Sequence, residues 1–96
     1  MNMKAFDWSE EKNEKLKNER EIGFEEVVIA ITDGRVLDYY PHPNPKKYPG
    51  QTVYVVEINH YAYLVPCVED SDKIFFKTIV PSRKATKLYI INKQSK

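Results

Sequence analysis

Four basic residues near the carboxyl end are spaced so that they could hold a phosphate. Arg83 and Lys84 fall in the first turn of a short helix expected after Ser82, whereas Lys77 precedes this helix on a strand and Lys87 follows one turn later. Unpaired N–H groups and the dipole make the start of a helix positive, so cations are disfavoured there unless an anion joins them. The spacing therefore predicts a patch for one or two phosphate groups. The alternative is that these cations only keep an exposed end of the chain in solution.

Charge is distributed unevenly along the chain. Acidic residues outnumber basic ones in the first third, the last acidic residue is Asp72, and every charged residue after it is basic. The net charge of +1 hides this polarity. Because a positive face attracts phosphate and accelerates association with it, the pattern favours an anionic partner such as RNA.

Aromatic side chains give a second signal for nucleic acid. The chain has seven tyrosines, and alternation along a predicted strand places Tyr61 and Tyr63 on one face, with His60 and Ala62 on the other. Aromatic rings beside cations can stack unpaired bases. Tyr61 and His60, together with Lys84, are therefore candidate RNA contacts. His60 is also a candidate acid or base, although no carboxylate adjacent in sequence orients it, and tyrosine is common in strands for packing alone.

Several classes of site and location are disfavoured by composition. The single cysteine, Cys67, allows no internal disulfide, and with two histidines it matches no zinc-ligand spacing. Three glycines far apart form no phosphate-binding loop, so we expect neither a metal nor a cofactor. No apolar run approaches the ~20 residues that span a bilayer, and no signal-peptide pattern opens the chain. A cytoplasmic protein without a membrane partner is expected.

The first third predicts a short edge strand and two helices. Phe6–Trp8 is the expected strand, and Asp7 with Glu10 fits a capping box that opens a surface helix from Trp8 to about Arg20. Apolar residues then recur at the spacing of a second helix, with Gly23 as its N-cap and Asp33-Gly34 as its end.

The rest of the chain predicts an antiparallel meander and a closing helix. Strands are expected from Val36 to Tyr40, Thr52 to Ile58, Tyr61 to Val68 and Ile74 to Val80. A proline-rich loop over 41–50 separates the first two strands, and Pro66 indicates a bulge or an exposed edge. The closing helix starts at Ser82 and docks through Ala85, Leu88 and Tyr89. These elements predict one α+β domain over 1–96, with a four-stranded sheet (plus the edge strand) and a frayed tail over 91–96.

Residues at both ends resemble a known family. Phe6-Asp7-Trp8, then Lys12-Asn13, then Ile22-Gly23-Phe24-Glu25-Glu26-Val27 are similar to the amino-terminal pattern of BrnT-like toxins of the RelE superfamily. Near the carboxyl end, Lys77 and the run from Ile79 to Tyr89 (IVPSRKATKLY) resemble that family's basic strand and closing helix. Pro81 and the long proline loop depart from the pattern, and lysine stands at several positions where the family has arginine.

The resemblance implies a metal-independent endoribonuclease toxin of a type II toxin–antitoxin module. Its RNA substrate would be mRNA, free or on the ribosome, and a DNA-binding antitoxin, of the ribbon-helix-helix type, would neutralise it. In this family the helices pack on one face of the sheet, and the cleft lies near the last strand and final helix. Carried over by position, Lys77 and Arg83 would clamp phosphate, Lys87 would be a second cation, and Tyr89 would transfer a proton or stack. A toxin-like module that binds antitoxin or RNA without cleavage, or a structural subunit with a solvated basic end, are the alternatives.

Overall fold

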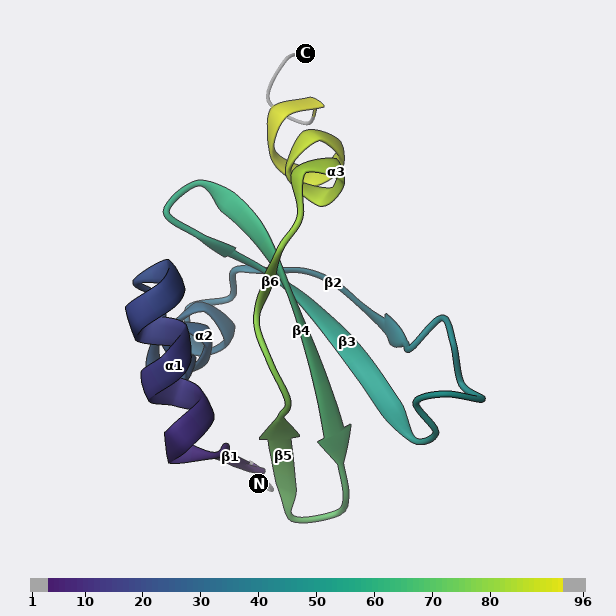
Figure 1. Ribbon diagram of the computed structural model, residues 1–96. Coiled ribbons are helices and arrows are strands. Elements are labelled where there is room, and N and C mark those ends of the chain that lie inside the picture. Colours follow the sequence, from purple (N-terminus) through teal and green to yellow (C-terminus); the bar gives the residue numbers. More distant parts are fainter. Residues whose placement is uncertain (1–3, 93–96) are drawn as a thin grey trace.

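The computed structural model describes residues 4–92 and shows an α+β fold (Figure 1). Its elements, in chain order, are β1 (Ala5–Asp7), α1 (Glu10–Arg20), α2 (Phe24–Thr32), β2 (Val36–Pro41), β3 (Gln51–Ile58), β4 (Tyr61–Glu69), β5 (Lys73–Phe76), β6 (Val80–Pro81), α3 (Arg83–Thr86) and the π-helical turn η1 (Lys87–Ile91). We call α3 and η1 together the closing helix. Of the tail expected at 91–96, Ile91 still belongs to η1, and residues 93–96 lie outside the described part. None of the helices within residues 4–92 combines the length and apolar character needed to cross a membrane.

The strands form one mixed sheet. Their order is β1-β5-β4-β3-β2, and β6 pairs with β4 beyond the end of β5. Every pairing is antiparallel except β1 with β5, which is parallel. The predicted edge strand is thus confirmed as β1, where the Ala5 N–H donates to the Asp72 carbonyl at 3.0 Å.

The last predicted strand is divided in two opposite Pro66. The Lys77 N–H donates to the Pro66 carbonyl at 2.8 Å, but proline has no N–H with which to complete the reciprocal pair. β5 therefore ends at Phe76, and β6 begins at Val80 with its register shifted by one, so that residues 77–79 face only two residues of β4. The predicted bulge is confirmed, but it lies at residues 77–79, opposite Pro66, and not on the strand of Pro66 itself. The alternative, that Pro66 lies on an exposed edge strand, is wrong because β4 is central.

The first helix begins two residues later than predicted. Asp7 remains paired with β5, and its Oδ1 accepts from the Trp8 N–H at 2.8 Å. The N-cap is Ser9, whose Oγ accepts from the Lys12 N–H at 3.3 Å. The predicted Asp7 capping box is therefore wrong, because the carboxylate is held in the strand and the next hydroxyl takes its place.

The second helix matches its prediction. Gly23 is the N-cap, and its N–H donates to the Glu26 Oε1 at 2.8 Å, which is the backward half of a capping box. The helix ends at Thr32, after which Gly34 adopts φ +78°, the left-handed conformation that glycine takes without strain.

A buried asparagine joins the two helices. Asn13 is fully buried, its Oδ1 accepts from the Phe24 N–H at 2.7 Å, and its Nδ2 donates to both Glu25 carboxylate oxygens at 3.1 and 3.0 Å. A Cβ on Gly23 would lie 2.8 Å from Asn13 Oδ1 and 2.6 Å from Lys17 Cε, so the junction needs glycine there for close approach.

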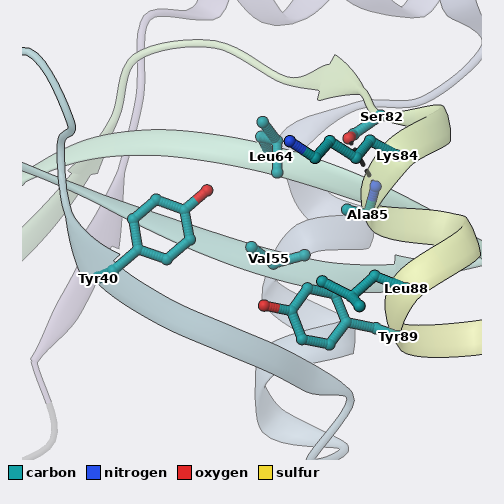
Figure 2. A pocket seen from close by; sticks show the side chains of 8 residues that line it. All are labelled: Tyr40, Val55, Leu64, Ser82, Lys84, Ala85, Leu88 and Tyr89. Carbon is teal, nitrogen blue, oxygen red and sulfur yellow. Dashed lines mark hydrogen bonds between the residues drawn. The ribbon is translucent and has the colours of Figure 1, made fainter. Parts of the chain in front are cut away.

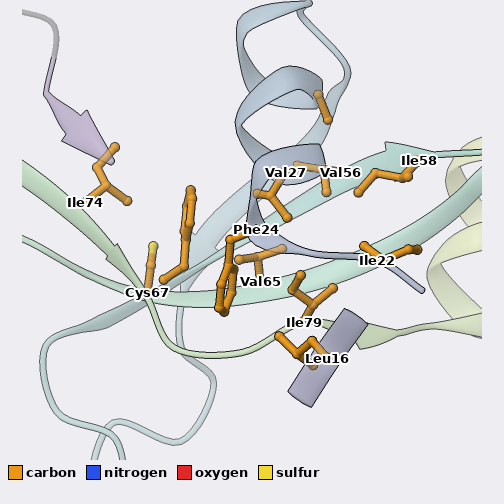
Figure 3. Close-up of a cluster of buried hydrophobic side chains, with 12 residues drawn as sticks. Leu16, Ile22, Phe24, Val27, Val56, Ile58, Val65, Cys67, Ile74 and Ile79 are labelled. Atoms are coloured by element: carbon orange, nitrogen blue, oxygen red, sulfur yellow. The ribbon is translucent and has the colours of Figure 1, made fainter. Parts of the chain in front are cut away.

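Side chains pack on both faces of the sheet. The larger cluster, between the sheet and α1 with α2 (Figure 3), contains Leu16, Ile22, Phe24, Val27, Ala30, Val56, Ile58, Val65, Cys67, Ile74, Phe76 and Ile79. The smaller cluster joins the closing helix, through Ala85 and Ile90, to Val55 and Ala62. Val55 and Val56 are adjacent in β3, so the two clusters lie on opposite faces. The family resemblance implied helices on one face, but the closing helix packs on the other.

Candidate functional site

A pocket of about 220 Å³ lies between the closing helix and the sheet, on the face opposite α1 and α2. We call it the helix–sheet pocket. Its lining residues are Tyr40, Val55, Leu64, Ser82, Lys84, Ala85, Leu88 and Tyr89. Figure 2 shows the Tyr40 ring facing the side chains of the closing helix across this space.

The closing helix is fixed to β4 at Ala62. The Ser82 N–H donates to the Ala62 carbonyl at 3.0 Å, which continues the β6 ladder by one bond. The returning bond would need the Ser82 carbonyl, but that group already accepts from the Thr86 N–H and hydroxyl in the first helical turn. The Thr86 hydroxyl takes its place and accepts from the Ala62 N–H at 2.8 Å. A buried threonine therefore completes the ladder while the chain turns into the helix.

A second attachment connects the closing helix to β2. The Tyr89 hydroxyl donates to a carboxylate oxygen of Asp38, and the Tyr39 N–H donates to the other at 2.8 Å. The Tyr89 hydroxyl first, and then the Tyr39 N–H, hold the pKa of the Asp38 carboxylate below its usual range. The same carboxylate raises the pKa of Tyr89. Tyr89 is thus a donor that stays protonated at neutral pH.

Two donors of the helix–sheet pocket have no partner in the described part of the chain. Within residues 4–92, the Tyr40 hydroxyl makes no hydrogen bond and the Lys84 ammonium makes neither a hydrogen bond nor an ion pair. Burial raises the pKa of Tyr40, and the nearby Asp38 carboxylate adds to this, so its hydroxyl also remains a donor. The pocket therefore offers an apolar floor with two free donors and no acidic lining residue.

The predicted catalytic residues are only partly brought together. Tyr89 lines the pocket, whereas Arg83 and Lys87 are exposed, one turn apart on the same helix, and are not among its lining residues. Lys77 is exposed at the bulge, with its ammonium 5.6 Å from the centre of the Phe75 ring. The expected anion site at the start of this helix is partly occupied, since the Ala85 N–H donates to the Ser82 hydroxyl at 3.0 Å.

The three predicted RNA contacts lie in different places. Lys84 lines the pocket, but Tyr61 packs edge-on against Tyr63, with ring centres 5.6 Å apart, on the face of α1 and α2. His60 occupies the β3–β4 turn with φ +64°, and its side chain is 91% exposed. Glu57, three residues earlier, places its Oε2 3.7 Å from His60 Nδ1.

Sequence reasoning missed Asp38, Tyr40 and Thr86 as contributors to this region. Asp38 and Tyr40 are two apart on β2 and therefore share a face, which is a signal that alternation could have given. The role of Thr86 had no local signal, because its partner Ala62 is far away in sequence.

Three comparisons with known proteins give no relative. No family model matches the chain, no curated protein matches it, and no solved structure matches it. The resemblance to BrnT-like toxins is thus carried by the quoted residues alone.

Proposed function

We propose that this protein is an endoribonuclease toxin with a BrnT-like, RelE-like fold, and that a small DNA-binding antitoxin of the ribbon-helix-helix type neutralises it. The observation that carries the proposal is the closing helix, which bears Arg83, Lys84 and Lys87 and places Lys84 in the lining of the helix–sheet pocket. The order of the elements supports it, with two helices, a mostly antiparallel sheet and a closing helix that begins at a serine.

Cleavage of RNA would use these side chains in distinct roles. The RNA 2′-hydroxyl gives its proton to a base and bonds to the adjacent phosphorus while negative charge grows on the phosphate oxygens. The bond from phosphorus to the 5′-oxygen then breaks, and that oxygen takes a proton from an acid as it leaves. Arg83 can grip the phosphate through two parallel N–H groups, while Lys84 and Lys87 act as point charges. Since the Tyr89 hydroxyl donates its single proton to Asp38 and its pKa is raised, Tyr89 does not serve as the base, and it would have to leave Asp38 in order to donate to the leaving 5′-oxygen.

Removal of the Arg83 guanidinium tests the proposal. We expect the wild-type chain to arrest growth when expressed and to cut RNA, either naked or on ribosomes. Loss of one donor to the transition state reduces such rates by ~10²–10³, so Arg83→Ala should be close to inactive. Arg20→Ala, which removes an exposed arginine from the last turn of α1, is the matched control and should keep full activity. Equal cleavage by the wild type and Arg83→Ala would refute the assigned role.

A non-catalytic RNA-binding module is the second candidate. It is favoured by the Tyr89–Asp38 contact, which keeps Tyr89 from acting as a base. This candidate predicts RNA binding that weakens steeply with salt, because cations displace counterions from phosphate, without any product. Product formation that depends on Arg83 would exclude it.

A further inference from the structure

The helix–sheet pocket has the size and the walls for one flat ring. Its volume of about 220 Å³ is below the ~300–1,000 Å³ that is usual for pockets enclosing a whole drug-sized ligand. The floor is apolar: Val55 is 1% exposed, Ala85 is 8% exposed, and Leu64 lies beside them. Aromatic rings from Tyr40 on β2 and Tyr89 on the closing helix flank the space (Figure 2).

The charge at the pocket favours a ring that is attached to an anionic group. Lys84 lines the pocket without an ion-pair partner in the described residues, and Arg83 and Lys87 are exposed on the same helix. The Asp38 carboxylate, which accepts from the Tyr89 hydroxyl and the Tyr39 N–H, keeps its negative charge, but it is not among the residues that line the pocket. An apolar slot for a ring, lined by one lysine without an ion-pair partner in the described residues, is complementary to a nucleotide.

We propose that the helix–sheet pocket seats one unpaired base of an RNA strand, stacked on Tyr40, with the adjoining phosphate held by Lys84. This inference rests on the proposed function for the identity of the strand. The base must be unpaired, because bases of a duplex are stacked on their neighbours and their faces are inaccessible.

The experiment separates binding of the base from cleavage. A fluorescent 2′-O-methyl RNA hexamer lacks the attacking hydroxyl, so it binds without being cut, and its affinity is measured by anisotropy with the full chain. The same hexamer is also made with abasic sites, and as a duplex. We expect the base-bearing single strand to bind about tenfold more tightly than the abasic strand or the duplex, in line with the stacking of one base on an aromatic ring.

Variants of two adjacent tyrosines locate the effect. Tyr40→Leu should abolish the difference between the base-bearing and abasic strands. Tyr39→Leu should preserve it, because Tyr39 points to the opposite sheet face and packs against Tyr54, with ring centres 4.6 Å apart and ring planes tilted by 45°. Equal binding of the base-bearing and abasic strands by the wild type would overturn the inference, and this comparison needs no variant to fold. An unchanged preference in Tyr40→Leu would also overturn it.

Cleavage of unmodified RNA is scored separately. If the chain prefers the base-bearing strand but yields no product, the pocket assignment stands and the nuclease proposal fails. If it yields product but binds the abasic strand equally well, the nuclease proposal stands and the pocket assignment fails. If none of the three probes binds, the pocket assignment fails, and product formation alone decides the nuclease proposal.

Discussion

Replacement of Asn13 by alanine tests the junction between α1 and α2. The Asn13 amide is fully buried and accepts the Phe24 N–H, at the start of α2, at 2.7 Å. Without it, this N–H remains inside the protein with no acceptor. A buried, unsatisfied donor costs about 1–3 kcal/mol of stability.

Two smaller effects adjust this value. Glu25 loses the Asn13 Nδ2 bonds but keeps the Lys17 ammonium at 3.3 Å, and its side chain is 49% exposed, so water can replace the lost partner. Alanine is also a better helix former than asparagine, by about half a kcal/mol. We therefore expect Asn13→Ala to lower the free energy of unfolding by about 1–2 kcal/mol, and the melting temperature by roughly 5–15 °C for a domain of this size.

Urea unfolding followed by circular dichroism measures this change. The midpoint should fall while the dependence of the free energy on urea stays the same, because the surface exposed on unfolding is unchanged. Asn18→Ala is the matched control, since Asn18 is exposed on the same helix and gains only the helix preference of alanine. If the two variants unfold at the same urea concentration, the buried hydrogen bond does not stabilise the junction.

Two further predictions concern the closing helix and acid stability. Thr86→Val keeps the shape of the side chain but leaves the buried Ala62 N–H without its acceptor, so the free energy of unfolding, measured by heat or urea, should fall by about 1–3 kcal/mol. Thr86→Ser keeps the hydroxyl and should retain most of that stability. Equal losses in both variants would show that the hydroxyl is unimportant. The Tyr89 hydroxyl and the Tyr39 N–H lower the pKa of Asp38, and the Asp72 and Lys73 N–H groups lower the pKa of Asp70. In acid the unfolded chain therefore binds more protons than the folded chain does. Stability should fall as pH drops below the ordinary aspartate pKa of about 4. Melting curves between pH 6 and about pH 3 measure this fall, and it should be smaller in Tyr89→Phe; an identical fall would exclude the Tyr89–Asp38 contact as a source.

Local patterns were enough to predict most of the elements. Gly23 and Gly34 marked the ends of α2 correctly because an N-cap and a left-handed C-terminal residue are properties of a few neighbouring residues. Alternation along β4 also placed Val65 and Cys67 on one face and Ala62 and Leu64 on the other. The cap of α1 was assigned wrongly, because β5 decides whether Asp7 pairs in a strand or caps a helix. This strand is far away in sequence: Lys73, whose ammonium contacts the Asp7 carboxylate, is 66 residues from Asp7.

By itself, the sequence determined the α+β class, the ends of α2, the proline loop and the concentration of cations after Asp72, because each depends on residues that are close along the chain. The tertiary structure decided which of those cations meet a pocket. Lys84 lines it and Lys77 does not, since the bulge opposite Pro66 and the Thr86–Ala62 bond set where the closing helix sits on the sheet. These contacts join residues far apart in sequence, and no local preference specifies them.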